Sequence, residues 1–215
     1  MTDKMKIDFV SDVSCPWCVI GLRALETALS HLAGEIEADI RFLPFELNPH
    51  MGPEGQNIVE HIGEKYGSTP EQSAETRAMI RERAGSLGFE MRMNEASRIY
   101  NTFDAHRLLH WALGEGKQSA LKHAMFKAYF TDGENMSDRE TLVRIAGSVG
   151  LDPAAARQIL ADDTFAADVR AEQAYYRQQG IHAVPAIVIN EKYLISGGQP
   201  IEVFERALRE IATQS

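Results

Sequence analysis

The sequence has little cysteine, no long apolar run and no excess of positive charge, and each shortage excludes a class of protein. Two cysteines in 215 residues are too few for a scaffold in which several disulfides replace a hydrophobic core. No apolar run approaches the roughly 20 residues that a membrane-spanning helix needs, so we expect no membrane insertion. The formal net charge of −9 argues against nucleic acid as a partner.

What is present fits one globular unit, since 44% of the residues are hydrophobic and 25% are charged. Residues 1–4 lead directly into the first predicted strand, without the apolar segment of a signal peptide. We therefore expect a cytoplasmic protein. In a reducing cytosol, an isolated cysteine pair is more often catalytic than structural.

Both cysteines lie in the segment Cys15-Pro16-Trp17-Cys18. Residues 5–10 alternate polar and apolar side chains as a strand does, and leucines recur at helical spacing between residues 22 and 32. Cys15 should therefore lie at the start of a helix, where free N–H groups and the helix dipole favour a thiolate. The thiolate is the nucleophile of disulfide exchange. Cys18, one turn further on, could then attack Cys15 once Cys15 is bound to a substrate.

Other interpretations of the cysteine pair are a structural zinc site and an accidental pair of buried thiols. A structural zinc ion normally has four ligands, and the chain has no second cysteine pair. His106 and His110, four residues apart, have a spacing that can chelate a metal, but no third ligand is evident. We expect these histidines to be structural and expect no metal. The strand-to-helix position of the CxxC favours redox chemistry.

Further strands and a long helical block complete the fold. Residues 36–45 read as a second strand, which should run parallel to the first. Caps, prolines and glycines then predict helices over residues 70–87, 98–113, 117–130, from Ser137 to about Gly150, from Asp152-Pro153 onward, and 165–179. Strands at 183–190 and 192–196 and a helix after Pro200 follow. This order predicts an α/β fold: a thioredoxin-like four-stranded sheet (residues 1–50 and 181–215) with a large all-helical insertion (residues 51–180).

Five motifs along nearly the whole chain carry a family resemblance: Ser11-Asp12, the CPWC segment, Asn101–Arg107, Val184-Pro185 and Ile195–Pro200. With them the sequence resembles the DsbA-type disulfide oxidoreductases of the thioredoxin fold, and within these the FrnE-like cytoplasmic branch, which is related to 2-hydroxychromene-2-carboxylate isomerase. The resemblance implies that Cys15 attacks, that Cys18 resolves, and that Pro185 is cis and faces the CxxC. Cis bonds are almost confined to X–Pro, and one here would leave the backbone of Val184 free to pair with an extended substrate.

Three neighbours of the cysteines carry further expectations. Pro16 fits a first helical turn, where its missing N–H costs nothing. The strongest oxidants of the family carry histidine where this chain has Trp17, so we expect a less oxidising disulfide here. Trp17 either contacts the substrate or shields the sulfur. Asp12, which ends the first strand, either relays a proton beneath the CxxC or caps a loop.

The predicted function is thiol–disulfide exchange on peptide or protein substrates. The CxxC itself is the redox group, so no organic cofactor is expected, and glutathione or a reductase is the expected redox partner. One alternative is a glutathione-dependent isomerase or transferase resembling 2-hydroxychromene-2-carboxylate isomerase, although such enzymes typically have serine where Cys15 stands. The other is a redox-sensing or chaperone-like binding module.

Overall fold

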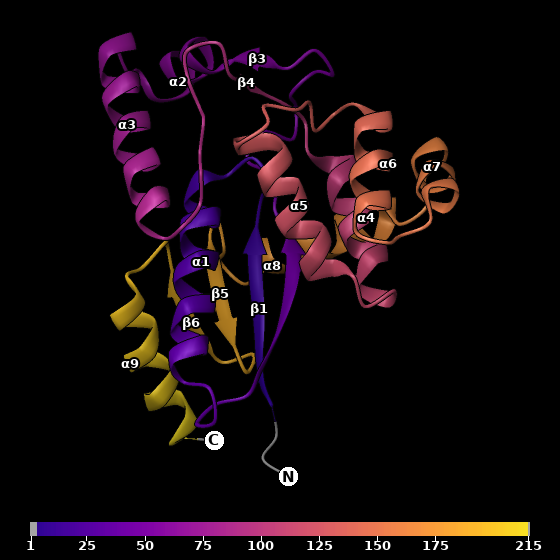
Figure 1. The fold of residues 1–215 in the computed structure, drawn as a ribbon. Helices are drawn as coiled ribbons and strands as arrows, with labels where there is room; N and C mark the ends of the chain where they lie inside the picture. Colours follow the sequence, from indigo (N-terminus) through magenta and orange to yellow (C-terminus); the bar gives the residue numbers. More distant parts are fainter. Residues whose placement is uncertain (1–3, 215) are drawn as a thin grey trace.

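A computed structural model describes residues 4–214; the first three residues, on which part of the leader expectation depends, lie outside this range. Its main sheet has four strands, as the sequence predicts, and their order is β2-β1-β5-β6 (Figure 1). β1 (Met5–Ser11) pairs in parallel with β2 (Ala38–Pro44), and antiparallel with β5 (Ala186–Ile189). β6 (Tyr193–Ser196) forms a hairpin with β5. This is the thioredoxin-like α/β core.

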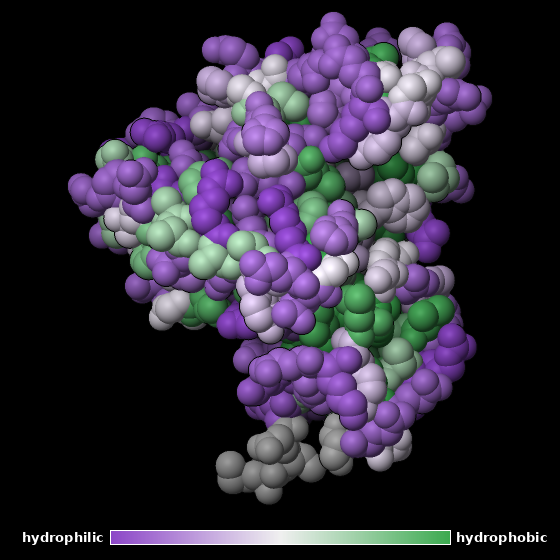
Figure 2. All heavy atoms as spheres, turned by 180° about the vertical axis from the view of Figure 1, so that it is seen from behind, coloured by the Kyte–Doolittle hydropathy of each residue, from purple (hydrophilic) through white to green (hydrophobic). Residues whose placement is uncertain are grey.

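Helices cover both faces of the sheet. α1 (Pro16–His31) and α9 (Ile201–Ala212) pack together on one face, where Ile7 and Phe9 of β1 join the larger hydrophobic core. α8 (Ala166–Gln178) lies behind the sheet (Figure 1); there Val10 contributes to a smaller cluster with Tyr176. Seen from behind, apolar side chains gather below the helices, on the side where β5 and β6 lie (Figure 2). Accordingly, Leu194 of the edge strand β6 is 55% exposed.

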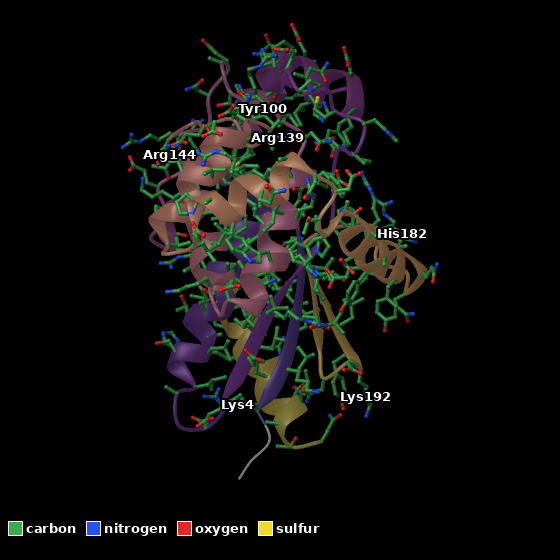
Figure 3. The ribbon with its side chains drawn as sticks, turned by 90° about the vertical axis from the view of Figure 1, so that its right-hand side faces the viewer. Lys4, Tyr100, Arg139, Arg144, His182 and Lys192 are labelled. Atoms are coloured by element: carbon green, nitrogen blue, oxygen red, sulfur yellow. The ribbon has the colours of Figure 1, made fainter. Side chains whose placement is uncertain are left out.

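The remaining helices come between β2 and β5 in the sequence and stand at one end of the sheet (Figure 1). Lys4 and Lys192 mark the opposite end, with Tyr100 and Arg139 in the helical part (Figure 3). The helices of this block, in chain order, are α2 (Ile58–Tyr66), α3 (Pro70–Ser86), α4 (Phe103–Gly114), α5 (Gln118–Phe130), α6 (Arg139–Ser148) and α7 (Pro153–Ala161). No helix within residues 4–214 is long and apolar enough to cross a membrane.

The predicted helix over residues 98–113 is wrong at its start. Arg98–Ile99 form the short strand β4, which pairs with β3 (Gln56–Asn57), and α4 begins only at Phe103. Between them, the Asn101 side chain accepts a hydrogen bond from the amide of Phe103 at 2.9 Å. This local bond offers the backbone an alternative to continuing a helix.

Two helix starts also differ from expectation. α2 is absent from the predicted set, although Asn57 caps it by accepting from the amides of Val59 and Glu60. Gly67, with φ of +70°, ends it. At α6 the cap is Asp138, whose side chain accepts from the amide of Thr141 at 2.8 Å. The predicted cap, Ser137, lies one residue before it, and a one-residue difference is common where several capping residue types stand together.

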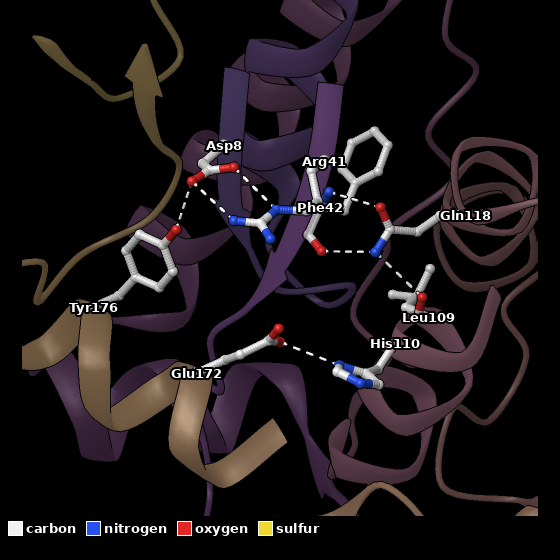
Figure 4. A network of polar contacts seen from close by, with 8 residues as sticks. All are labelled: Asp8, Arg41, Phe42, Leu109, His110, Gln118, Glu172 and Tyr176. Carbon is white, nitrogen blue, oxygen red and sulfur yellow. Dashed lines mark hydrogen bonds and ion pairs between the residues drawn. The ribbon is translucent and has the colours of Figure 1, made fainter. Parts of the chain in front are cut away.

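A side-chain amide fixes the helical block to the outer strand of the sheet (Figure 4). Gln118 of α5 accepts from the amide of Phe42 and donates to its carbonyl, both at 2.9 Å. It also donates to the carbonyl of Leu109 in α4 at 3.2 Å. β2 is an edge strand, and Gln118 therefore takes the place of a missing neighbouring strand. On the face of the sheet that α8 covers, Asp8 of β1 accepts hydrogen bonds from Arg41 of β2 at 3.1 Å and from Tyr176 of α8 at 2.7 Å.

Replacing Gln118 by leucine should destabilise the fold. The variant keeps the bulk but leaves the buried amide and carbonyl of Phe42 unpaired, at about 1–3 kcal/mol for each group. Urea unfolding should therefore show a loss of about 2–6 kcal/mol. Gln178→Leu, on the exposed end of α8, is the matched control and should stay within about 0.5 kcal/mol. Equal effects of the two substitutions would show that the bridge to β2 does not stabilise the protein.

Candidate active site

Cys15 caps the amino terminus of α1, as the sequence predicts. Its backbone is extended, with φ of −92° and ψ of 111°, and Pro16 occupies the first helical turn. The amide of Cys18 donates to the Cys15 sulfur at 3.2 Å. The Cys15 thiol in turn lies 3.7 Å from the carbonyl oxygen of Val184 and donates to it. The sulfur thus has a helix-terminal N–H on one side and the carbonyl of Val184, shortly before β5, on the other.

Cys18 differs from Cys15 in its surroundings. It is fully buried in the hydrophobic core beneath the helix terminus. Burial raises the pKa of the Cys18 thiol well above its usual range, and the neighbouring Cys15 adds to this rise; Lys122 acts in the opposite direction. Both cysteines are thiols in this structure. The Cys15 side chain interacts with the Cys18 thiol, and the raised pKa means that Cys18 requires a nearby stabilising group to ionise.

Pro185 packs directly against α1. The Val184–Pro185 peptide bond is cis, as the resemblance implies, and Pro185 is buried. A Cβ at Gly21 would lie only 3.1 Å from Cγ of Pro185, and one at Gly198 would lie 3.1 Å from the carbonyl oxygen of Trp17. The absence of side chains at these two glycines therefore lets the segments before β5 and after β6 approach α1.

Trp17 is half-buried beside the cysteines, and Arg83 of α3 lies over its ring. The guanidinium carbon is 5.4 Å from the ring centre, within the range of a cation–π contact. The same guanidinium donates to the carbonyl of Gly198 at 3.3 Å. Arg83 was not among the predicted site residues. The sequence places it in a helix with several other arginines and gives no signal that selects it.

Asp12 is fully buried, and both oxygens of its carboxylate accept hydrogen bonds. One carboxylate oxygen accepts from the amide of Leu47 at 2.7 Å and the other from the amide of Ser14 at 3.4 Å. His106 Nε2 lies 3.4 Å from the second oxygen and donates to the carbonyl of Phe45 at 3.1 Å. Burial alone would raise the pKa of Asp12, but His106 and the amide of Leu47 outweigh it, and the net shift is downward.

The two histidines with metal-chelating spacing have different partners. His106 faces Asp12, whereas His110 lies 3.4 Å from Glu172 of α8 (Figure 4). Within residues 4–214, no group of three or more histidine, cysteine, aspartate or glutamate side chains is arranged to hold a metal ion. His106, contributed by α4, is buried beside Asp12.

Lys122 of α5 is a second site residue that sequence reasoning missed. It is fully buried and close enough to Cys18, Asp12 and Cys15 to interact with their charges. The available signal was a lysine next to Leu121 on a helix with many apolar residues. A single lysine in such a position is usually read as a solvent-reaching side chain, and for that reason the pattern does not select it.

The carboxylate of Asp12 should make the stability of the protein fall toward acid pH. The pKa of Asp12 is lower in the folded protein than the value of about 3.9 that is usual in an unfolded chain. The ionised carboxylate therefore makes its full contribution to folding stability above about pH 3.9. It disappears as the pH falls through the folded pKa. Asp12→Asn should cost about 2 kcal/mol at pH 7, and the difference from the wild type should shrink below about pH 4.

Urea unfolding between pH 3 and 7 measures this difference. Asp39→Asn, at an exposed position of β2, is the control and should give a small difference at every pH. A difference for Asp12→Asn that does not change with pH would contradict the inferred role of the buried carboxylate.

Comparisons with known proteins agree with this geometry. The family model of the DSBA-like thioredoxin domain matches residues 6–209. A probable DsbA oxidoreductase from Streptomyces coelicolor is 34% identical with a TM-score of 0.90, covering 98% of this chain and 91% of that one. A 2-hydroxychromene-2-carboxylate isomerase is 15% identical with a TM-score of 0.70, covering 97% of each chain.

The cytosolic disulfide reductase DsbM from Pseudomonas aeruginosa, in a structure with GSH, is 16% identical with a TM-score of 0.63. That match covers 97% of this chain and 99% of the other. The isomerase and the reductase, at such low identity, show the shared fold alone. The match to the family model spans nearly the whole chain and agrees with the motifs that the sequence displays. The chain belongs to the family of DSBA-like thioredoxin domains.

Proposed function

We propose that this protein is a thiol–disulfide oxidoreductase that exchanges electrons with peptide or protein substrates through Cys15 and Cys18. The observation that carries the proposal is the position of the Cys15 sulfur. At the α1 terminus it accepts a hydrogen bond from the amide of Cys18 at 3.2 Å, and it lies 3.7 Å from the Val184 carbonyl oxygen. A helix-terminal sulfur stabilised in this way is suited to nucleophilic attack.

The reaction proceeds in two exchanges. The Cys15 thiolate attacks one sulfur of a substrate disulfide, forming a mixed disulfide and releasing the other substrate sulfur as a thiolate. The Cys18 thiolate then attacks Cys15, releasing the second substrate thiolate and forming the Cys15–Cys18 disulfide. The substrate gains two electrons and the CxxC loses two. The reverse sequence oxidises a substrate dithiol, and no organic cofactor is needed in either direction.

The surroundings of Cys15 suit an extended peptide. Val184 offers a backbone carbonyl beside the sulfur, so a substrate strand can pair there by strand addition. Trp17 and Pro16, both half-buried, give an adjoining apolar contact. Arg83, stacked on Trp17, adds a positive charge that can bind a carboxylate. Pro185 holds the Val184 segment against α1 through its contact with Gly21.

Glutathione is the redox partner that we infer, and the cytosol is the compartment. The structure of DsbM with GSH supports glutathione, because that protein shares the fold and is described as a cytosolic disulfide reductase. A tripeptide with two carboxylates also suits a site where Arg83 lies over Trp17, which stands between the two cysteines in the sequence. In this role glutathione returns the CxxC disulfide to the dithiol through two successive exchanges.

Substitution of each cysteine should give a different chemical outcome. Cys15→Ser should reduce exchange with a model peptide disulfide at least a thousandfold, because the remaining thiol is buried and poorly ionised. Cys18→Ser should accumulate a mixed disulfide on Cys15, since nothing resolves it. Intact-mass spectrometry after acid quenching measures both. Adducts on Cys18 in the Cys15→Ser protein, formed at the wild-type rate, would reverse the assignment.

Replacing Trp17 by histidine should make the disulfide more oxidising. An imidazole between Pro16 and Cys18 stabilises a nearby thiolate by charge or by a hydrogen bond, and this stabilises the reduced protein. Each unit by which the pKa of the attacking thiol falls makes the two-electron couple more oxidising by about 30 mV. A titration in glutathione buffers measures the potential. Trp17→Phe separates the loss of indole from the gain of imidazole, and equal potentials for the two variants would refute the prediction.

A second candidate function is a glutathione-dependent isomerase, which the shared fold of 2-hydroxychromene-2-carboxylate isomerase favours. The two functions predict opposite results for Cys15→Ser. An isomerase of this type typically has serine at this position and should retain glutathione-dependent turnover of its substrate. A disulfide oxidoreductase should lose all exchange. We favour the oxidoreductase because Cys18 gives the chain a resolving thiol that an isomerase does not use.

A further inference from the structure

The resolving step raises a problem that the cysteines alone do not solve. Cys18 must lose its proton before it can attack Cys15, since only the thiolate reacts. It is fully buried, and burial holds the pKa of its thiol well above the usual range. The α1 terminus does not correct this directly, because the Cys18 amide is directed to the sulfur of Cys15. A positive charge close to Cys18 would provide the missing stabilisation.

Lys122 is a fully buried cation without a conventional partner. Among the residues that the structure describes, its amine has no hydrogen-bond partner. Its nearest aromatic neighbours are the ring of Phe126, at 4.7 Å from the amine to the ring centre, and the ring of Phe42, at 5.9 Å. Burying an ammonium group against apolar side chains alone is strongly unfavourable. The carboxylate of Asp12 offsets part of this cost, and an anion that forms at Cys18 during the reaction would offset more of it.

Resting on the exchange reaction proposed above, we propose that Lys122 is a positioning residue that stabilises the Cys18 thiolate during the resolving step. The two residues lie on helices that touch: Cys18 is on α1 and Lys122 is on α5, and the neighbouring His123 of α5 lies 2.7 Å from Glu26 of α1. The helical block thus supplies a buried positive charge on the side of α1 that faces the core.

The electrostatics of the surroundings agree with this role. Burial lowers the pKa of Lys122 to about 8, while Cys18, Asp12 and Cys15 act to raise it. The effect is reciprocal, since Lys122 favours the charged form of Cys18. An amine with this pKa is largely protonated at pH 7 and can also release its proton at slightly higher pH. Asp12 remains negative beside it, because its own pKa is lowered.

A small cavity lies beside the Lys122 side chain. Lys122 lines it together with His106 and His110 of α4 and Glu172 of α8. Its volume of about 10 Å³ gives room for about one water molecule. The His110–Glu172 pair, drawn in Figure 4, is only half-buried. These groups, with Cys15, Cys18 and Asp12, are the titratable groups that face Lys122.

Oxidation by Ellman's reagent separates the two exchanges, since each releases one coloured thiolate. Cys15 displaces the first and forms a mixed disulfide. Cys18 then displaces the second from Cys15 and forms the internal disulfide, so that the reagent gains the two electrons that the dithiol loses. Stopped-flow absorbance of the fully reduced protein should therefore show two phases. An absent first phase would contradict the proposed function itself, and the second phase reports on Lys122.

Lys122→Met should slow the second phase selectively. A nearby opposite charge shifts a pKa by about one to three units. Each unit by which the pKa of Cys18 rises lowers the thiolate fraction about tenfold, while the remaining thiolate becomes about threefold more nucleophilic. The second phase at pH 7 should therefore be about three to thirty times slower, and its dependence on pH should shift to higher values. Lys127→Met, at an exposed position on the same helix, should match the wild type. An unchanged second phase and pH profile in a folded Lys122→Met protein would overturn the proposal.

A measurement on the wild-type protein covers the case in which Lys122→Met does not fold. The ¹³Cε resonance of Lys122, in protein labelled at lysine, should titrate with a midpoint near 8 in the reduced state. Oxidation removes the thiols that favour its charged form, and the midpoint should fall. A purely structural lysine would titrate independently of the redox state, and that result would also overturn the proposal.

Discussion

The hydrogen bond from the Cys18 amide to the Cys15 sulfur is the interaction on which the rest of the site depends. It forms only if β1 ends at Ser11 and α1 begins directly after Cys15. The parallel pairing of β1 with β2 fixes the first condition, and Pro16 in the first helical turn favours the second. The clearance at Gly21 and Gly198 then lets the Val184–Pro185 segment close over the same helix end. The sulfur is held between donor and acceptor as a result.

The two cysteines are adjacent but chemically unequal. Both are buried in the hydrophobic core, but Cys15 caps α1, whereas burial raises the pKa of the Cys18 thiol. In the proposed reaction, this inequality assigns the order of the two exchanges. It also explains why the helical block matters for chemistry, since α3, α4 and α5 contribute Arg83, His106 and Lys122 to the vicinity of the CxxC. Gln118 anchors this block to β2, so the polar groups of the block are held against the sheet.

Local patterns in the sequence were sufficient to predict the sheet, its parallel pair and the helix-capping position of Cys15. The CxxC, the strand periodicity and the Val-Pro pair are each readable over a few residues. The short strand Arg98–Ile99 was missed because its partner, Gln56–Asn57, is distant in the sequence. Arg83 and Lys122 were missed for a related reason. A cation on a helix normally reaches solvent, and only the tertiary packing shows that Lys122 is buried beside Cys18.

The most direct test of the central claim is the equilibrium of the CxxC in glutathione redox buffers, read by intact mass after alkylation of free thiols. The account predicts one two-electron transition between the dithiol and the internal disulfide, at a potential between about −270 and −120 mV, as in other thioredoxin-fold couples. A glutathione adduct should appear only in small amounts, because Cys18 resolves it. Cysteines that stay reduced in every buffer, or a glutathione adduct that persists as the end product, would contradict the account.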